Sequence, residues 1–379
     1  MKKYFFIIIA LCVLAGCAGK GTDTPGGPVF DSIIYEPDYA SGFTISGKEG
    51  SESVMLSVSN PWQGADSVVQ RLLIVRGGEE VPEGFDGQVL RGDAKRIVAM
   101  SSTHVAMLDA LGATDRVVAV SGPDYFTNPR ILARRDSLAD AGYEGNVNFE
   151  ALIASSPDLV LLYGVNGASS MERKLNTLGI PYVYIGDYLE QSPLGKAEWM
   201  VAIAEITGLG NRGRDTFSQI AERYEALRKE VASDAGVRPK VMLNVPYGDS
   251  WFMPSASSYM AQLIRDAGGE YVYKKDTGNS SRPIGMEEAY LLASEADVWL
   301  NLDRTASAGE LKARWPRFAD TGAVVSGRLY NNTRRANSAG GNDFFESGIV
   351  NPDVILRDLI GIFHPALSDG DPYYYKRLE

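Results

Sequence analysis

The sequence predicts an α/β protein with two Rossmann-like α/β lobes that are joined by one long helix, and with a small strand-rich N-terminal extension. Three observations predict this class. From residue 95 onward, short apolar strand patterns alternate with helical patterns, which is typical of parallel βαβ units. The same order of motifs occurs twice, about 145 residues apart. A stretch with only helical patterns separates the two copies.

The first lobe is predicted over residues 93–190. A buried-strand pattern at 97–100 precedes hydroxyl side chains at 101–103, a helical pattern at 104–111 and then a glycine. This is the order of a strand, a helix cap, a helix and a helix end. Further strand patterns follow at residues 117–120, 159–163 and 182–185.

The second lobe is predicted over residues 237–379 because the same order returns there. A strand pattern at 240–245 leads through serines to a helical pattern at 259–267. A repeat of this length indicates two similar lobes rather than a solenoid, whose repeats run about 20 to 50 residues. Two lobes in turn imply a cleft between them. A helix-start motif ahead of a strand that begins with Asp also occurs in both copies, at Phe149-Glu150 with Asp158 and at Met286-Glu287 with Asp297.

Residues 191–236 are predicted to link the lobes through helices. Apolar side chains keep helical spacing on both sides of the glycine-rich segment 208–213. At 1.5 Å per residue, the helix after this segment would be about 30 Å long, enough to cross one lobe and to restrict its opening. The alternative is one more peripheral helix on a single large sheet.

The segment Gly208–Gly213 matches the dinucleotide-binding pattern Gly-x-Gly-x-x-Gly letter for letter. That pattern binds a pyrophosphate only between a strand and a helix, where the phosphate meets the helix N-terminus. Because the residues before Gly208 have helical spacing, we interpret the segment as a break between two helices.

The N-terminus is predicted to be a signal peptide over residues 1–16. Lys2 and Lys3 precede an apolar run and a small-residue end, and the run is too short to span a bilayer. The ending Leu-Ala-Gly-Cys resembles the lipobox of bacterial lipoproteins, in which Cys17 is lipidated. The alternative is an ordinary signal peptide with an incidental Cys. Residues 17–28 then form a flexible tether, and the strand-rich extension covers 29–92 with an unassigned role.

The composition excludes several classes of function. The net charge is −11, and it becomes −13 when the signal peptide removes Lys2 and Lys3. Such an acidic chain without a Lys/Arg cluster is not expected to bind nucleic acid. Cys12 leaves with the signal peptide and Cys17 is consumed by lipid, so the folded part has no thiol for a disulfide or a thiolate metal site. Only two histidines are present, which excludes a three-histidine zinc site.

Several ordered motifs resemble one family. Arg96-Ile97-Val98 with its Ser/Thr loop, Asn148-Phe149-Glu150 with Pro157-Asp158-Leu159-Val160, and the linking helix are similar to the periplasmic substrate-binding proteins of ABC importers for ferric siderophores, haem and cobalamin. The resemblance extends from about residue 93 to the C-terminus, and the lipobox agrees with it. It implies a lipid-anchored periplasmic receptor that captures a metal chelate between its lobes and delivers it to a permease. No catalytic residue, cofactor or protein-bound metal is expected.

The resemblance also implies two docking residues. In that family each lobe presents a surface glutamate to arginines of the permease, and Glu150 and Glu287 occupy the matching positions. Two carboxylates on separate lobes would set encounter and register with the partner. The alternative is that both are acidic residues in a first helical turn, where the helix dipole favours them.

Ligand contacts are expected on loops that leave the C-terminal ends of the strands. Aromatic side chains there suit a large planar ligand, and arginines suit anionic oxygens, so we expect an iron chelate, siderophore or haem, before a corrinoid. His104 is alternatively a capping or core residue, and the two tyrosines of the first lobe are alternatively core rings. The candidates are Thr103, His104, Tyr125, Tyr163, Tyr247, Trp251, Arg282, Asn332 and Arg334.

Two other classes of function remain as alternatives. An exported enzyme on the same two-lobed scaffold would need converging Cys or His ligands for metal chemistry, which the composition hardly supplies. A structural lipoprotein without a working cleft would be favoured if Trp251 and Arg282 were both packed away from it.

Overall fold

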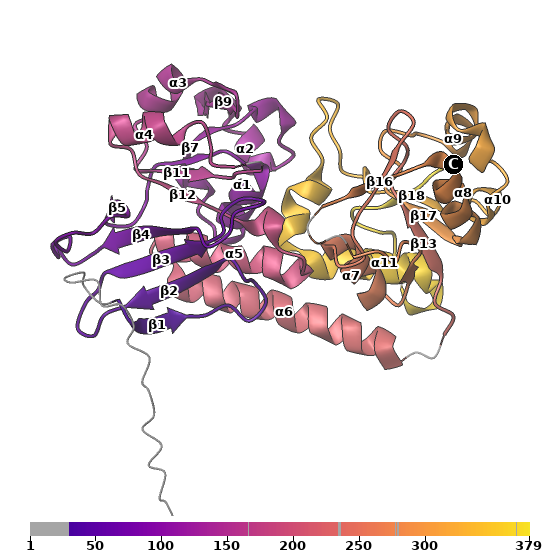
Figure 1. The fold of residues 1–379 in the computed structure, drawn as a ribbon, viewed down its shortest axis with the longest axis horizontal. Coiled ribbons are helices and arrows are strands. Elements are labelled where there is room, and N and C mark those ends of the chain that lie inside the picture. The colour runs from indigo at the N-terminus through magenta and orange to yellow at the C-terminus, as the bar shows by residue number, and fades with distance from the viewer. Residues whose placement is uncertain (1–29, 166, 234–235, 277, 279, 369) are drawn as a thin grey trace, which may run out of the picture.

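The computed structural model describes residues 30–379 except 166, 234–235, 277, 279 and 369. The predicted signal peptide (1–16), the predicted lipidation site Cys17 and the predicted tether (17–28) lie outside the described residues. The described strands form three five-stranded sheets and two two-stranded ribbons. One five-stranded sheet belongs to the extension and one to each lobe, with the extension beneath the first lobe (Figure 1).

The first lobe contains a fully parallel sheet in the order β12-β11-β6-β7-β8. In chain order this is 5-4-1-2-3, the Rossmann arrangement. Its central strands are apolar throughout because helices or other layers cover both faces. The strands are β6 (Ile97–Ala99), β7 (Val117–Val120), β8 (Ala139–Asp140), β11 (Leu159–Leu162) and β12 (Tyr182–Tyr184). The helices are α1 (Ser102–Ala110), α2 (Pro129–Leu132), α3 (Phe149–Ala154) and α4 (Glu172–Leu178), and a short ribbon pairs β9 (Gly142–Tyr143) with β10 (Asn146–Val147).

The second lobe has the strand order β15-β13-β17-β18-β19, with only β19 antiparallel. In chain order this is 2-1-3-4-5, the flavodoxin-like arrangement, so the two lobes are similar but not identical in topology. The strands are β13 (Lys240–Leu243), β15 (Glu270–Tyr271), β17 (Val298–Leu300), β18 (Leu329–Asn331) and β19 (Lys376–Arg377), with a ribbon of β14 (Trp251–Met253) and β16 (Arg282–Ile284). The helices are α7 (Tyr259–Asp266), α8 (Met286–Glu295), α9 (Ala308–Arg314), α10 (Gly322–Val325) and α11 (Pro352–Phe363).

The repeat found in the sequence has a physical counterpart at the start of the strands. Asp158, just before β11, accepts hydrogen bonds from the backbone N–H groups of Lys95 and Arg96, ahead of β6. Asp297, just before β17, accepts one from the N–H of Lys240 in β13. In both lobes one carboxylate therefore fixes the register of two neighbouring parallel strands. The helices that follow β6 and β13 are also capped alike, by Ser101 and Ser258.

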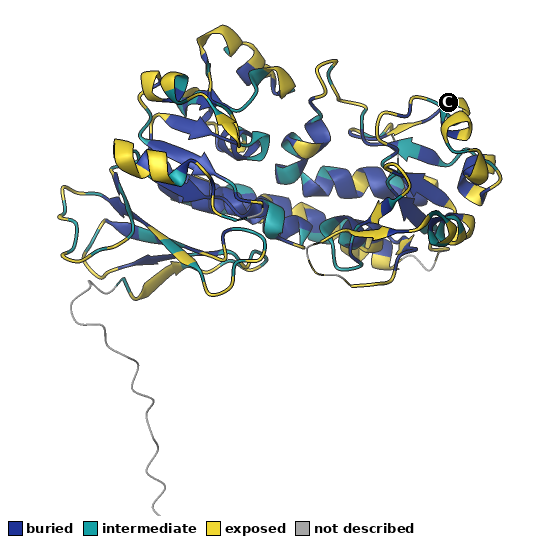
Figure 2. Ribbon diagram, turned by 45° about the horizontal axis from the view of Figure 1, so that its top comes forward, coloured by how far each residue is buried: buried dark blue, intermediate teal, exposed yellow. Residues whose placement is uncertain are grey.

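The linking segment consists of two helices with different environments. Every residue of α5 (Pro193–Ile206) is buried, whereas α6 (Gly210–Ser233) has one apolar face and extends for about 36 Å along the molecule. Figure 1 shows α6 beneath both lobes, and Figure 2 shows α5 as part of the buried interior. The single linking helix of the prediction is α6, and α5 is a core helix.

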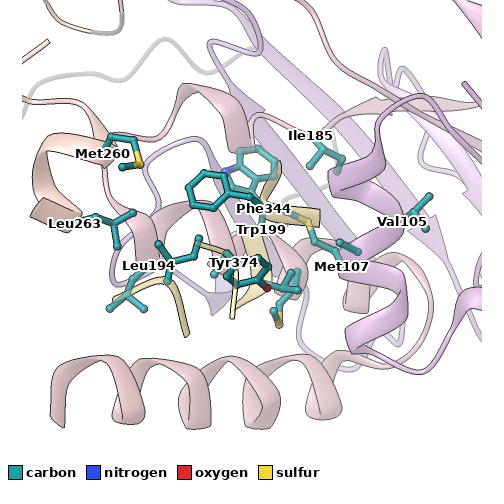
Figure 3. Packing of buried hydrophobic residues seen from close by; sticks show 14 of the residues in the cluster. Val105, Met107, Ile185, Leu194, Trp199, Met260, Leu263, Phe344 and Tyr374 are labelled. Carbon is teal, nitrogen blue, oxygen red and sulfur yellow. The ribbon is translucent and has the colours of Figure 1, made fainter. Parts of the chain in front are cut away.

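The two lobes share one continuous hydrophobic core. Figure 3 shows Trp199 and Leu194 of α5 between Met107 of α1 in the first lobe and Met260 of α7 in the second. Phe344, from the chain after β18, lies in the same cluster. The lobes are therefore packed together through α5 as well as connected by α6.

The extension forms a sheet in the order β1-β2-β3-β4-β5, antiparallel except for the last pair. The alternating and continuous apolar runs at 54–58 and 71–75 are its central strands, as predicted. Two buried carboxylates, Glu190 at the end of the first lobe and Glu198 in the linking segment, hold the chain between its first two strands. The strands are β1 (Ser32–Tyr35), β2 (Phe43–Gly47), β3 (Val54–Ser59), β4 (Val69–Val75) and β5 (Gln88–Arg91).

Candidate functional site

The strand orders locate the region where a ligand is expected. In a doubly wound sheet, ligands bind beyond the carboxyl ends of the strands, where the strand order reverses. This point lies between β6 and β11 in the first lobe and between β13 and β17 in the second. Asn244 and Asn301 directly follow β13 and β17 with φ of 67° and 62°, a left-handed conformation that Asn tolerates and that turns the chain away from the sheet.

The loops of the two lobes meet on this side of the molecule. The side-chain amide of Asn337, in the loop after β18, donates to the backbone carbonyls of Asp124 and Phe126 in the first lobe, at 3.2 and 2.9 Å. Glu346 accepts hydrogen bonds from the backbone N–H groups of Thr127 and Asn128, at 2.7 and 3.2 Å. The chain from 335 to 346 therefore belongs to the second lobe and rests on the first.

A buried polar group lies where the first lobe, α5 and α7 come together. The Lys196 ammonium donates to the backbone carbonyl of Asp187 at 2.9 Å and lies 4.9 Å from the ring centroid of Tyr259. Burial raises the pKa of the Asp187 carboxyl to about 6, although the Lys196 charge and the Thr103 hydroxyl both oppose this rise. Burial lowers the pKa of Lys196. Thr103 therefore lies beside a polar contact between the lobes.

A pocket of about 820 Å³ opens at the ends of β7 and β8. Tyr125 and Tyr143 line it with 61% and 62% of their surface exposed, so both rings are available to a ligand. Its volume is within the range of small-molecule sites. The carboxylates of Asp124 and Asp140 are its only charged side chains. Its full lining is Ser121, Gly122, Pro123, Asp124, Tyr125, Asp140, Gly142, Tyr143, Asn146, Val147 and Asn148.

The pocket lies beside the contact between the lobes. A Cβ atom on Gly341 of the second lobe would collide with the backbone carbonyl of Tyr125, so only glycine permits this close approach. Sequence reasoning found Tyr125 because it follows a strand and a Gly-Pro turn. It missed Tyr143, which lies in a two-residue strand after β8 that no apolar periodicity marks.

Tyr163 lies at the end of β11, at the reversal point of the first sheet, and is half-buried. Burial raises the pKa of its phenol, and the nearby carboxylate of Glu144 adds to the rise. Glu144 accepts hydrogen bonds from Ser169 and Ser170. The predicted contact is thus at the expected strand end, with its ring partly covered.

Two arginines and one tyrosine predicted as ligand contacts are exposed in the second lobe. Tyr247 has 82% of its surface exposed in the turn before β14. Arg282 is exposed, but it belongs to strand β16 and not to the irregular loop that its surroundings suggested. Arg334 is exposed and pairs with Asp371 at 3.2 Å, so part of its charge is already compensated.

The prediction for Trp251 is wrong in this structure. Its ring is fully buried, stacks on Trp299 with centroids 5.3 Å apart, and meets Phe318 edge-on at the same distance. The indole N–H donates to the carbonyl of Leu243 at 2.9 Å. Trp251 therefore belongs to the core of the second lobe, because the β14–β16 ribbon folds it back onto the β13–β17 sheet.

The predictions of His104 and Asn332 as ligand contacts are also wrong, because both side chains are buried. His104 is fully buried in α1, and neither ring nitrogen has a hydrogen-bond partner among the described residues. Burial lowers the pKa of the imidazole to about 3, against the effect of the Leu161 carbonyl. Asn332 has only 5% of its surface exposed. The core alternative for His104 is therefore the correct one.

The two predicted docking glutamates are exposed on different lobes. Glu150 lies in the first turn of α3 and Glu287 in the first turn of α8. Figure 1 shows these helices on the first and second lobes, away from α6. Glu287 pairs with Arg317 at 3.2 Å, and both side chains are more than half exposed. The pairing lowers the pKa of Glu287, after a contribution from its own backbone N–H.

The glycine-rich segment begins between two helices, and α6 starts at Gly210. The carboxylate of Asp93 lies where a side chain on Gly208 would be, and that of Glu205 where one on Gly210 would be. Both carboxylates are paired with Arg76. The positive end of α6 therefore faces the protein's own carboxylates across a pocket of about 500 Å³, which agrees with the rejection of a dinucleotide site.

The described parts of the chain hold neither a candidate metal site nor a candidate membrane span. No group of three or more His, Cys, Asp or Glu side chains is arranged there to hold a metal ion. None of the helices there is both long and apolar enough to cross a membrane.

Two doubly wound lobes that meet at the carboxyl ends of their strands define a two-lobed solute-binding protein. Residues 97–336 match the periplasmic binding protein family, and the chain belongs to this family. It is 25% identical to an uncharacterised lipoprotein of Methanocaldococcus jannaschii, over 83% of this chain and 79% of that protein. It is also 25% identical to a cobalamin-binding protein of Halobacterium salinarum, over 58% of each chain.

A solved structure shows the same fold. A periplasmic haem-binding protein from Pseudomonas aeruginosa superimposes with a TM-score of 0.58 at 17% identity, over 76% of this chain and 98% of that chain. The family match starts at residue 97, so the extension lies outside it.

Proposed function

We propose that this protein is the lipid-anchored substrate-binding protein of an ABC importer, and that it captures a metal chelate between its lobes. The observation that carries the proposal is the 820 Å³ pocket with exposed Tyr125 and Tyr143, which opens at the ends of β7 and β8 in the first lobe, next to the contact of Tyr125 with Gly341 of the second lobe. Flat aromatic surfaces of this kind bind large planar or amphipathic molecules. The protein performs no covalent chemistry in this proposal.

The cellular location follows from the family and the N-terminus together. A signal peptide that ends in Leu-Ala-Gly-Cys would export the chain and attach Cys17 to lipid. The similarity to a lipoprotein over most of the chain supports this anchoring. Binding would then occur in the periplasm, next to the permease that receives the cargo.

An iron chelate, siderophore or haem, is the first candidate cargo, and exposed Arg282 supports it because a guanidinium favours anionic oxygens. A corrinoid is the second candidate, and one observation favours it. The charged groups of the large pocket are the acids Asp124, which pairs with Arg135, and Asp140, and the second arginine, Arg334, is paired with Asp371. This lining suits a neutral or cationic chelate, and the relative from Halobacterium salinarum is named a cobalamin-binding protein.

Binding assays test the proposal directly. A ferric siderophore, haem and cyanocobalamin should be titrated separately into the purified protein, with tryptophan fluorescence and equilibrium dialysis as readouts. We expect one of them to bind with Kd below about 10 μM, which corresponds to about −7 kcal/mol. Tyr125→Ala should weaken that binding about tenfold or more, whereas Tyr290→Ala on α8, outside the pocket, should leave it unchanged. Failure of all three ligands to bind below this limit would refute the proposal.

A further inference from the structure

The extension reaches the ligand side of the first lobe through the loop between β3 and β4. Trp62 in this loop forms a parallel bridge with Gly164, which follows β11. Its ring lies edge-on to that of Tyr184 at the end of β12, with centroids 5.5 Å apart. The loop is therefore attached to the carboxyl edge of the first lobe's sheet, the edge at which ligands bind in this class of fold.

Gln63 in the same loop connects all three parts of the molecule. Its backbone N–H donates to the Tyr188 hydroxyl at 3.1 Å, and that hydroxyl donates in turn to the carbonyl of Gly164. Its side-chain amide donates to the hydroxyl of Ser280 in the second lobe at 2.7 Å. Ser280 lies two residues before Arg282. The loop thus closes one side of the region between the lobes.

A pocket of about 570 Å³ lies under this loop. Eight of its thirteen lining residues come from the extension, which lies outside the family match. The lining is Ser41, Gly42, Ser59, Asn60, Trp62, Gln63, Gly64, Ala65, Gly186, Leu189, Glu190, Trp199 and Ser280.

The lining is polar but offers no positive charge. Glu190 is its only charged residue, and this carboxylate already accepts hydrogen bonds from the N–H groups of Ser41 and Gly42 and from the Trp199 indole, at 2.9, 3.1 and 3.0 Å. A carboxylate on a ligand would lose its water shell here without gaining a cation. A neutral amide group, by contrast, can both donate to and accept from hydroxyl and amide side chains such as Gln63 and Ser280.

The 820 Å³ pocket and the 570 Å³ pocket lie at opposite ends of the carboxyl edge of the first lobe's sheet. The large pocket adjoins β7 and β8, and the extension pocket adjoins β12. Four strand spacings of about 4.8 Å separate β12 from β8, so a cargo that occupies both must extend over about 19 Å.

We propose that the extension builds a second subsite, in which Gln63 and its loop hold a neutral, hydrogen-bonding arm of the chelate. This inference rests on the proposed function and adds to it the chemistry of the cargo's arm. It also gives the extension a role in specificity. Chelates with amide arms would gain from the subsite, whereas chelates whose only polar arms are carboxylates would not.

The test compares Gln63→Ala with Gln70→Ala, because Gln70 is on the next strand and outside both pockets. The probes are cyanocobalamin, which carries neutral amide arms, a ferric trihydroxamate whose linkers contain amides and which therefore also counts as a neutral-armed probe, and haem, which carries carboxylates. Gln63→Ala should weaken binding of a neutral-armed probe about fivefold to tenfold, and Gln70→Ala should not change it. Ala65→Trp, which fills the subsite, should weaken the same probe more strongly. Unchanged melting temperatures would show that the variants are folded.

The possible outcomes separate the two proposals. If the wild-type protein binds none of the probes, the proposed function fails. If it binds a probe and Tyr125→Ala weakens that binding, but Gln63→Ala and Ala65→Trp do not, the receptor function stands and the subsite is refuted. Exclusive binding of haem, or an equal loss for haem and a neutral-armed probe in Gln63→Ala, would also refute the subsite.

Discussion

At the scale of single residues, burial decides which chemically versatile side chains take part in binding. His104 and Trp251 are of types often found in ligand sites, yet both are fully buried. Tyr125 and Tyr143, in contrast, keep more than half of their surface exposed beside a pocket. The residue type therefore indicates what a side chain can do, and its accessibility determines whether it does so.

Replacement of His104 by Leu should make the stability less dependent on pH. The pKa of His104 is about 3 in the folded protein and near its usual 6.5 in the unfolded chain. Unfolding therefore takes up a proton between these values, and the folded state loses stability as the pH falls from about 6.5 toward 3. Between pH 7 and pH 5 the wild-type protein should lose about 2 kcal/mol more than His104→Leu. Urea unfolding at both pH values measures this, and parallel losses in the two proteins would contradict it.

Sequence reasoning succeeded for residues whose position follows from a strand end. Tyr125 follows a strand and a turn, and Thr103 follows a capping serine, so both were placed on the correct edge of the sheet. It failed for Trp251 because the β14–β16 ribbon pairs residues about thirty positions apart, Trp251 with Ile284. No local pattern reveals such a pairing, because the residues around Trp251 and Ile284 would have the same composition in a loop as in a ribbon.

At the scale of elements, α5 is unusual because it is buried on all sides and yet carries charged residues. The carboxylate of Glu198 is fully buried and accepts hydrogen bonds from the backbone N–H groups of Asp38, Tyr39 and Ala40, at 2.9, 2.8 and 2.6 Å. It also accepts one from the Tyr35 hydroxyl at 2.7 Å. Burial and this carboxylate together hold the pKa of Tyr35 well above its ordinary value. One side chain of α5 therefore anchors the first turn of the extension.

Glu198→Gln should loosen the extension from the rest of the molecule. The new amide group would face backbone N–H donors with a donor of its own, and one buried partner would be lost. We expect the free energy of unfolding to fall by roughly 2 to 3 kcal/mol, and chymotrypsin to cleave the native variant near Tyr39 faster than the wild-type protein. Glu230→Gln, at an exposed position of α6, is the matched control. An unchanged cleavage pattern would show that the sheet itself, not Glu198, attaches the extension.

The strands β6, β7, β11, β12 and β13 were predictable within one or two residues because they are continuous apolar runs, whereas the two-residue strands β8, β15 and β19 were not. The fully buried environment of α5 could not be predicted from the sequence. Lys196, Glu198 and Glu205 are charged side chains of a type usually found in solvent, but each is matched in the interior by backbone groups or by Arg76. The flavodoxin-like strand order of the second lobe was also beyond the sequence, because the repeat of motifs is the same for either order.

At the scale of the whole molecule, we propose that the exposed acids Glu150 and Glu287 on the two lobes dock on a membrane partner. Glu150 and Glu287 start helices on separate lobes, and the chain after the predicted cleavage carries a net charge of −13. Charges of this kind mainly govern encounter and orientation between proteins. The partner surface should therefore be basic at two separated points.

The double variant Glu150→Ala and Glu287→Ala should bind its chelate with wild-type affinity but should not support uptake. Neither residue lines a described pocket, so ligand binding has no need of them. A reconstituted importer with radiolabelled cargo measures uptake, and Glu83→Ala with Glu230→Ala is a control of equal charge at other exposed positions. Loss of chelate affinity in the first pair would mean that these residues have a different role, and normal uptake would remove them from the docking surface.

The two-lobed organisation and its internal repeat could be predicted from the sequence because motif order survives in the chain. The contact between the extension and the second lobe could not be predicted from the sequence. The hydrogen bond between Gln63 and Ser280 joins residues 217 positions apart, and both lie in loops without periodicity.

The shared core around α5 also determines how the protein can be divided. Trp199 packs against Phe43 of the extension with ring centroids 4.8 Å apart, while Leu194 lies with Met260 and Leu263 of the second lobe in the same cluster. If either lobe were expressed alone, part of the apolar surface of α5 would be exposed to water, and we expect the fragment to aggregate. Gene fusions, truncations or split reporters made from this receptor will therefore need α5 together with all three of its neighbours.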